Sequence, residues 1–234
     1  IPVGNTPGVL TDATADFAFT LLMAAARRIG EAINYVREGR WQTWGLTLLL
    51  GQSVNGATLG IVGLGRIGQA LARRARGFDM NVLYYDAVRQ PEAEAELGVQ
   101  YRALEDLLRE SDFVSLHVSL TKETRGLMNA RTFALMKPTA VLINTSRGPV
   151  VNHEALYEAL KVGQIGYAAL DVTDPEPLPA DHKLLELPNL IVAPHIASAT
   201  VSSRNLMASR AVENLIAGLR GEQLPYCVNP EVYG

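Results

Sequence analysis

The sequence predicts an α/β fold in which a doubly wound parallel sheet carries helical extensions at both ends. From residue 58 onward, short continuously apolar segments alternate with helical stretches, which is typical of parallel strands covered by helices on both faces. A glycine-rich turn follows the first apolar segment and opens the next helix, as in the Rossmann-type sheets that bind dinucleotides. Together these observations predict a dinucleotide-binding domain.

Six strands are expected, at 58–62, 81–85, 113–116, 140–144, 167–172 and 190–193. The helices expected between them include 67–78, 103–109 and 153–161. Asn152 is placed to cap the last of these helices, and Gly163 follows its end.

Helices are also expected on either side of the sheet. Thr11 and Asp12 can cap a long helix that runs to about Glu38, with Gly39 just past its end. A loop containing both tryptophans then leads to the first strand. A final helix, roughly 200–220, precedes a tail that contains proline.

Composition argues against several classes of protein. The 234 residues include 21 Lys and Arg and 24 Asp and Glu, and this formal charge of −3 argues against a polybasic nucleic-acid or membrane-surface binder. No run of about 18 apolar residues is present, so no transmembrane helix is expected, and the first residues show no signal-peptide pattern. The single cysteine, Cys227, has no partner for a disulfide, which is compatible with the cytoplasm.

The glycine-rich turn is informative because each glycine has a separate role. Gly63 can make the tight turn, Gly65 lets the backbone approach a pyrophosphate, and Gly68 lets the helix pack closely on the strand. The phosphates would meet the N-terminus of the helix, whose free N–H groups and dipole favour anions. Arg66 is placed to add a positive charge there.

The choice between NAD and NADP depends on the residues after the second strand. Asp86 comes 18 residues after Gly68, where a carboxylate accepts hydrogen bonds from the ribose hydroxyls and repels a 2′-phosphate. Arg89, three residues later, could accommodate that phosphate. We therefore expect NAD as the cofactor, with NADP possible.

Three further polar residues follow three successive strands, where open α/β sheets place their ligands. Arg147 follows strand 140–144, Glu176 follows strand 167–172, and His195 follows strand 190–193. Each could be an ordinary loop residue if taken singly. Beside a dinucleotide site they form the set that carbonyl reduction needs.

The chemistry of that set follows from the residue types. A hydride that reaches a carbonyl carbon leaves negative charge on the oxygen, and an imidazole such as His195 can supply the proton near neutral pH. A glutamate bonded to the other ring nitrogen would stabilise the imidazolium and fix its orientation. The planar guanidinium of Arg147 suits a substrate carboxylate.

Other candidates have weaker signals. Asp171 could hold the nicotinamide carboxamide, support the site, or simply cap a turn. His117 is expected beside the cofactor loop, whereas His153 and His182 are expected on the surface. No clustered Cys and His pattern indicates a metal site.

These motifs resemble the D-isomer-specific 2-hydroxyacid dehydrogenase family over essentially the whole chain. The segments that carry the resemblance are 5–16, 63–68, 142–148, 170–177 and 194–198. The resemblance implies that Arg147 binds substrate, Glu176 supports His195, and His195 is the acid and base. Ser119 and Ala197 stand where relatives commonly have Pro and Gly.

The residues expected at the cofactor, from the motif and from the resemblance, are Gly63, Gly65, Arg66, Ile67, Gly68, Asp86, His117, Val118, Ser119, Thr124, Thr145, Arg147, Asp171, His195 and Ala197.

Within the family, segments 170–179 and 214–222 resemble glyoxylate/hydroxypyruvate reductases. This implies an NAD(P)H-dependent reduction of a small 2-oxo acid, glyoxylate or hydroxypyruvate, to the 2-hydroxy acid. Two alternatives stay open. One is a related D-lactate, phosphoglycerate or formate dehydrogenase, and the other is a cofactor-binding protein without useful turnover, either an NAD-sensing corepressor or a truncated module.

The resemblance also implies a domain organisation and a homodimer. Residues 1–10 would end a substrate domain, 11–198 would form the NAD-binding domain, and 199–234 would return to the substrate domain. Roughly a hundred residues that relatives carry before Ile1 would build most of the substrate domain. Trp44 is the best match to a Trp that enters the partner's substrate pocket, although a place in the dimer core is equally compatible.

Overall fold

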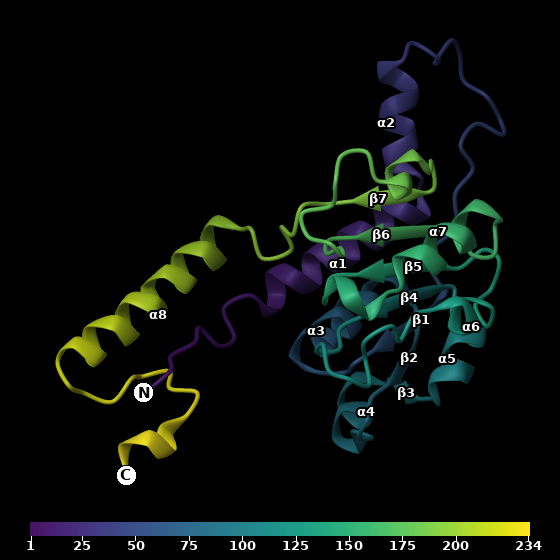
Figure 1. Cartoon of the computed structure of the whole chain (residues 1–234). Helices are drawn as coiled ribbons and strands as arrows, with labels where there is room; N and C mark the ends of the chain where they lie inside the picture. The colour runs from purple at the N-terminus through teal and green to yellow at the C-terminus, as the bar shows by residue number, and fades with distance from the viewer.

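The computed structural model describes residues 1–234 and confirms the doubly wound sheet (Figure 1). Seven strands, all parallel, lie in the order β3-β2-β1-β4-β5-β6-β7. Their bounds are β1 Thr58–Val62, β2 Asn81–Tyr85, β3 Gln100–Tyr101, β4 Phe113–Leu116, β5 Val141–Asn144, β6 Tyr167–Leu170 and β7 Leu190–Val192. The strand order reverses between β1 and β4, and ligands of such sheets bind beyond the strand ends at this point.

All six predicted strands are present, and β1, β2 and β4 have the predicted bounds. The sequence analysis missed β3, a two-residue edge strand beside β2. The strands β6 and β7 end earlier than predicted, because the chain turns there into the loops that carry polar residues.

Helices cover both faces of the sheet. Their bounds are α1 Thr11–Ala26, α2 Ile29–Arg37, α3 Arg66–Ala75, α4 Pro91–Leu97, α5 Leu104–Glu110, α6 Ala130–Phe133, α7 His153–Lys161 and α8 Val201–Leu219. One face packs on α1, α3 and α4, and the other on α5, α6 and α7. None of these helices has the length and apolar composition that a membrane crossing requires.

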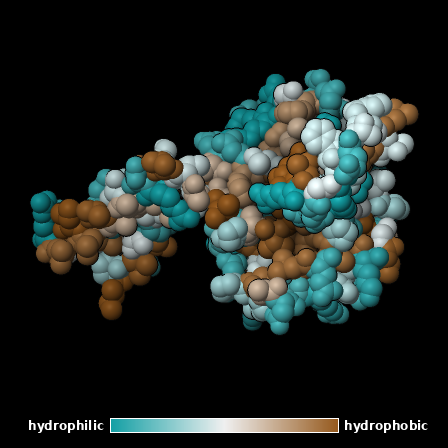
Figure 2. Space-filling view, turned by 90° about the horizontal axis from the view of Figure 1, so that it is seen from above, coloured by the Kyte–Doolittle hydropathy of each residue, from teal (hydrophilic) through white to brown (hydrophobic).

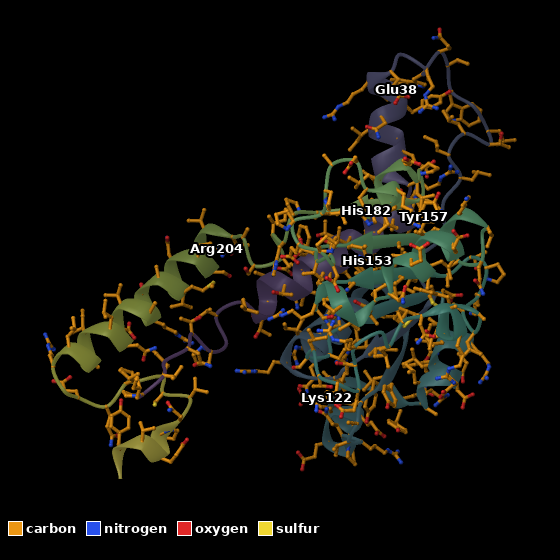
Figure 3. All side chains as sticks on the ribbon, viewed as in Figure 1. Glu38, Lys122, His153, Tyr157, His182 and Arg204 are labelled. Atoms are coloured by element: carbon orange, nitrogen blue, oxygen red, sulfur yellow. The ribbon has the colours of Figure 1, made fainter.

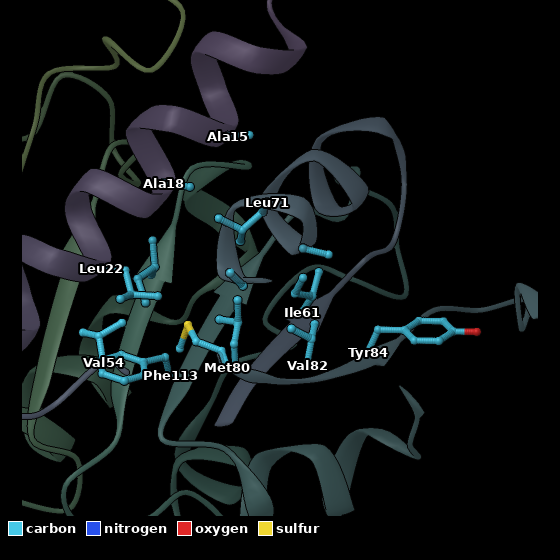
Figure 4. Packing of buried hydrophobic residues seen from close by; sticks show 14 of the residues in the cluster. Ala15, Ala18, Leu22, Val54, Ile61, Leu71, Met80, Val82, Tyr84 and Phe113 are labelled. Atoms are coloured by element: carbon cyan, nitrogen blue, oxygen red, sulfur yellow. The ribbon is translucent and has the colours of Figure 1, made fainter. Parts of the chain in front are cut away.

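The core under α1 and α3 fixes the first half of the sheet (Figure 4). Leu22 from α1 and Leu71 from α3 are fully buried against the sheet, where Phe113 of β4 joins them. Burial of one such side chain stabilises the fold by about 1.5–3 kcal/mol. This packing holds the glycine-rich turn between β1 and α3 in a rigid frame.

The long helix predicted from Thr11 to Glu38 is wrong, because it breaks into α1 and α2. Arg28 adopts the left-handed conformation, with φ 52° and ψ 38°. Its guanidinium forms an ion pair of 2.6 Å with Glu31 and donates to the carbonyl oxygen of Leu50. These contacts stabilise the turn at the break, two residues before Gly30.

The predicted helix ends are confirmed in part. Asn152 caps α7 through a hydrogen bond from the backbone of Ala155, and Gly163 follows that helix with φ +71°. Gly39 follows α2 with φ +70°. The cap at Thr11 is wrong, because the N-cap of α1 is Leu10, with no side-chain hydrogen bond.

At the C-terminal end, α8 leaves the sheet and pairs with both chain ends (Figure 1). Gly4 and Cys227 form an antiparallel bridge, and the buried Asn214 of α8 bonds both to the carbonyl of Asn5 and to the backbone N–H of Tyr226. We call α8 with residues 1–7 and 220–234 the arm. Apolar side chains stand on its surface (Figure 2), and the exposed ones on α8 are Val201, Leu206, Val212, Leu215, Ile216 and Leu219.

Candidate active site

The glycine-rich turn has the geometry that the sequence predicts. Gly63 has φ +98°, and a Cβ there would lie 2.9 Å from the backbone carbon of His117. A Cβ on Gly68 would lie 2.3 Å from the carbonyl oxygen of Gly63, so only glycine lets α3 approach β1 this closely. A Cβ added to Gly65 would have no atom within 4 Å, so the turn is open at the N-terminus of α3.

Asp86 is fixed beside this turn at the end of β2. One carboxylate oxygen accepts hydrogen bonds from the backbone N–H of Leu64 (2.8 Å) and from the amide of Gln90 (3.3 Å). The other accepts from the N–H of Ala87 at 2.7 Å. A negative charge therefore stands at the outer end of the glycine-rich turn.

A cavity of about 490 Å³ opens from the turn across the carboxyl ends of the strands. It is lined by Leu10, Thr14, Ile67, His117, Val118, Ser119, Leu120, Thr145, Ser146, Arg147, His195, Ala197 and Ser198. The hydroxyl of Thr145 is buried here without any hydrogen-bond partner. A buried hydroxyl without a partner is costly, so the cavity offers a polar contact to a ligand.

Arg147 stands on a loop held by the end of β5. The buried Asn144 accepts hydrogen bonds from the N–H and the hydroxyl of Ser146 and donates to the carbonyl of Arg147 at 3.0 Å. At Gly148 a Cβ would lie 1.8 Å from the carbonyl oxygen of Thr173, so this loop lies directly against the one that carries Glu176. The guanidinium of Arg147 is exposed and donates only to the carbonyl of Ser146, so it has no carboxylate partner.

Glu176 and His195 form the predicted pair. Oε1 of Glu176 lies 2.5 Å from Nδ1 of His195. Both side chains are partly exposed, so this ion pair contributes little to stability. It orients the imidazole, and Nε2 is left without a protein partner.

The turn that carries His195 is held by Asp171. The two carboxylate oxygens of Asp171 accept hydrogen bonds of 2.8 Å from the backbone N–H groups of Ile196 and Ala197. The carbonyl of Asp171 also accepts from the N–H of His195, which has φ 55°. Burial raises the pKa of Asp171 above its ordinary value, although these hydrogen bonds oppose that shift. Asp171 therefore fixes the backbone of the turn on which His195 stands.

His195 separates the cofactor-side cavity from a second hollow. The second hollow, of about 590 Å³, extends from His195 and Glu176 toward Pro177, Leu178 and Leu185. Both hollows include His195 in their walls, so the imidazole is accessible from two sides.

The structure places the other predicted cofactor residues in two groups. Ile67, Val118 and Ser119 line the cavity. Thr124 does not, because its hydroxyl donates to the carbonyl of Ser119 at 2.7 Å and closes the loop instead. Arg66, the first residue of α3, is exposed beside the open turn.

Two histidines are shielded from solvent: His117 is half-buried in the cavity wall, and His153 is buried. His117 bonds through Nε2 to the hydroxyl of Ser115 at 2.8 Å, and burial lowers its pKa to about 4. The expected exposure of His153 is wrong: the loop after β6 covers it, and its Nδ1 lies 2.8 Å from the carbonyl oxygen of Asp174. His182, at the same end of the sheet (Figure 3), is half-buried.

Several wall residues were missed by the sequence analysis. Leu10, Thr14 and Ser198 line the cavity from the two segments that join the sheet to the arm. They lie in segments 5–16 and 194–198, which carry the family resemblance, but they bear no charge that signals a ligand, and only the positions of α1 and the turn after His195 bring them together. A purely local signal could not have identified them.

A glycine-rich turn at the switch point of a parallel sheet, which shares a cavity with the imidazole of a carboxylate–imidazole pair, is typical of a dinucleotide-dependent dehydrogenase. The sequence profile of the D-isomer specific 2-hydroxyacid dehydrogenase NAD-binding domain matches residues 19–197. The chain belongs to this family, and its cofactor is NAD(P).

Known relatives agree with this family. A glyoxylate reductase of Korarchaeum cryptofilum is 58% identical over 233 residues, which are 99% of this chain and 70% of that protein. The crystal structure of the TT0316 protein from Thermus thermophilus superposes with a TM-score of 0.93 at 50% identity, covering 97% of this chain and 71% of that one. D-lactate dehydrogenase from Lactobacillus jensenii, solved with NAD+, gives a TM-score of 0.86 at 33% identity, covering 97% and 72%. The chain therefore spans about 70% of the length of its relatives.

Proposed function

We propose that the protein reduces glyoxylate, and hydroxypyruvate in the same site, to the 2-hydroxy acid with NADH. The observation that carries the proposal is the contact of 2.5 Å between Glu176 and His195, beside the unpaired guanidinium of Arg147. The similarity to the glyoxylate reductase of Korarchaeum cryptofilum supports glyoxylate as the substrate.

The residues around the cavity fit a dinucleotide. The open backbone at Gly65 suits the pyrophosphate, the carboxylate of Asp86 suits the ribose hydroxyls, and the unpartnered hydroxyl of Thr145 suits a polar group deeper in the cavity. Arg66 adds a positive charge beside the phosphates. The reduced nicotinamide supplies a hydride to the substrate carbonyl when the cofactor is bound.

His195 is proposed to supply the proton. Its Nδ1 is occupied by Glu176, so Nε2 is the nitrogen that can donate to the carbonyl oxygen as negative charge develops there. The carboxylate of Glu176 stabilises the imidazolium before the transfer and keeps the ring oriented. Asp171 holds the backbone on which this imidazole stands.

Arg147 is proposed to bind the substrate carboxylate. A guanidinium offers two parallel N–H donors to a carboxylate, and Arg147 has no ion pair within the protein that would compete. Its backbone is fixed by Asn144. The acid would therefore be held within reach of His195, which lines the same cavity.

Residues 11–198 are proposed as the NAD-binding domain, with 1–10 and 199–234 belonging to a substrate domain. The match of the family profile to 19–197 and the separation of the arm from the sheet support this division. Limited proteolysis would test it, with cleavage expected near residues 8–10 and 198–200 and protection inside the sheet. Cleavage within β1 to β7 before these positions would contradict it.

The protein is proposed to be a homodimer that meets its partner through α2 and the loop after it. Apolar side chains are exposed on both, and a concentration of exposed apolar residues in one segment is typical of an interface. They are Ile29, Ile33, Val36, Trp41, Trp44, Leu46, Leu48 and Leu50. Light scattering coupled to gel filtration should give twice the chain mass, and Ile33→Glu should give the monomer. A wild-type monomer would refute the proposal.

A cytoplasmic location is proposed as well. The lone Cys227 is a free thiol, which is compatible with a reducing compartment. Cell fractionation with an antibody against the chain would test it, and recovery outside the cytoplasmic fraction would contradict it.

A substrate panel tests the main proposal. Oxidation of NADH is followed with glyoxylate, hydroxypyruvate, pyruvate and 3-phosphohydroxypyruvate at equal concentrations. We expect the highest kcat/KM with glyoxylate or hydroxypyruvate. A preference for pyruvate would assign a D-lactate dehydrogenase instead, and tight NADH binding without turnover of any acid would assign a binding protein.

A further inference from the structure

Arg89 is the residue that could accommodate the 2′-phosphate of NADP. In the structure its guanidinium forms an ion pair with Glu94, although 63% of the Arg89 side chain is exposed. Its Nε and Nη2 donate to the two carboxylate oxygens of Glu94, each at 2.8 Å. This is a bidentate arginine–carboxylate pair, the strongest geometry available to the two groups. The face of the guanidinium also lies over the ring of Tyr101, 5.9 Å from its centroid.

Glu94 is itself held in place from the core. The hydroxyl of Tyr84 donates to Oε1 of Glu94 at 2.7 Å and accepts from the backbone N–H of Gln90 at 2.8 Å. Tyr84 belongs to β2 and is fully buried. Hydrogen bonds from Arg89 and Tyr84 lower the pKa of Glu94 to about 2, so the carboxylate is ionised at neutral pH.

The same loop connects this pair to Asp86. The side-chain amide of Gln90 donates to the carboxylate of Asp86 at 3.3 Å. The backbone N–H of Gln90 donates to the hydroxyl of Tyr84, which in turn donates to Glu94. The two carboxylates thus have different roles. Asp86 faces the glycine-rich turn, and Glu94 binds the guanidinium of Arg89.

We infer that Glu94 is a specificity-determining residue, which holds Arg89 in an ion pair and so withholds it from the 2′-phosphate of NADP(H). The inference rests on the NAD(P) cofactor of the family and on the proposed role of Asp86. The Nε–Nη2 edge of Arg89, which could hold a phosphate through two parallel hydrogen bonds, is taken by Glu94, so a 2′-phosphate has to compete with this pair for the arginine. Glu94 therefore adds to the preference for NAD(H) without touching the cofactor.

The test measures the dissociation constants of NADH and NADPH by fluorescence titration, with turnover as a second readout. Glu94→Gln keeps an acceptor for Tyr84 but removes the charge that binds Arg89. We expect NADPH to bind about tenfold tighter, the effect of one charge-assisted contact, while NADH binding changes less than about twofold. The matched control is Glu92→Gln, which removes one charge from the exposed surface of the same helix and should change neither constant.

Two further variants separate the freed arginine from the lost negative charge. The double variant Glu94→Gln with Arg89→Ala should return NADPH binding to the wild-type value. Arg89→Ala alone should leave NADPH binding unchanged, because Arg89 is already withheld, and it tests the inference even if the glutamine variant folds poorly.

A Glu94→Gln variant that binds both cofactors with an unchanged ratio overturns the inference, and so does weaker NADPH binding in Arg89→Ala. A wild-type protein that binds neither cofactor would refute the proposed function instead.

Discussion

His195 and Glu176 meet through a single ring nitrogen: Nδ1 lies 2.5 Å from the glutamate oxygen, while Nε2 has no partner in the protein. The two residues come from loops after different strands, so only the parallel order of β6 and β7 brings them together. One nitrogen of the imidazole is therefore held by the protein, and the other is free to exchange a proton with a substrate.

Replacing His195 by Ala should lower kcat by about 10²–10⁴, because the developing negative charge on the substrate oxygen loses its proton donor. Binding of NADH, measured by fluorescence titration, should change only a few-fold. Glu176→Gln should cause a smaller loss, about tenfold or more, because the imidazole remains but loses its charged partner. Full activity of the alanine variant would refute the role of His195.

Arg147→Met should raise KM for the 2-oxo acid by about 10–100-fold, which is the effect of losing charge-assisted hydrogen bonds of about 1.5–3 kcal/mol. Arg147→Lys should recover only part of that loss, since an ammonium cannot form the planar fork. Arg125→Met is a suitable control because this arginine is exposed and its side chain makes no hydrogen bond. Equal KM values in all variants would exclude Arg147 as the carboxylate-binding residue.

Gly68→Ala should destabilise the fold by about 1–3 kcal/mol, because its Cβ would enter the carbonyl oxygen of Gly63 and force α3 away from β1. NADH binding should weaken as well, since the turn moves with the helix. At Gly77, where no atom lies within 4 Å of the added Cβ, the same change should leave stability equal or slightly higher. Urea unfolding of both variants measures the difference, and similar stabilities would contradict the packing argument.

Stability should fall with acid through His117. Burial holds its pKa at about 4 in the folded protein, whereas an unfolded histidine titrates near about 6.5. Between these values the unfolded chain binds more protons, so the free energy of unfolding decreases as the pH falls from about 6.5 toward 4. At about pH 5 the loss from this group should be about 2 kcal/mol. His117→Asn should lose correspondingly less stability between about pH 7.5 and pH 5; identical losses would show that His117 does not contribute.

The sheet was predictable because its signals are local. Runs such as 113–116 are apolar throughout apart from one serine and bounded by polar residues, so parallel strands with two buried faces are visible in the sequence. The same holds for the glycine-rich turn, whose spacing reflects steric needs within six residues. The predicted placement of Arg147, Glu176 and His195 after strand ends followed from that sheet.

Features set by distant contacts were not predictable. Arg28 at the break contacts the loop at Leu50, 22 residues away, and apart from Gly30 the sequence there consists of ordinary helix formers. The burial of His153 depends on the loop at Asp174, which lies over the first turn of α7. By contrast, α4 had a readable signal, with Pro91 in its first turn and Gly98 just after its end, and it was nonetheless missed.

The way the arm joins the sheet has a mechanical consequence. The chain passes between the two parts twice, and Leu10 and Ser198, one on each crossing, line the same cavity. The two crossings, at Leu10 and Ser198, define an axis. Rotation of the arm about this axis bends each crossing only locally, whereas sliding or twisting of the arm would strain both crossings. Atoms close to such an axis move least, so we expect His195, three residues before Ser198, to keep its setting in any such swing, in which the outer end of α8 would travel furthest.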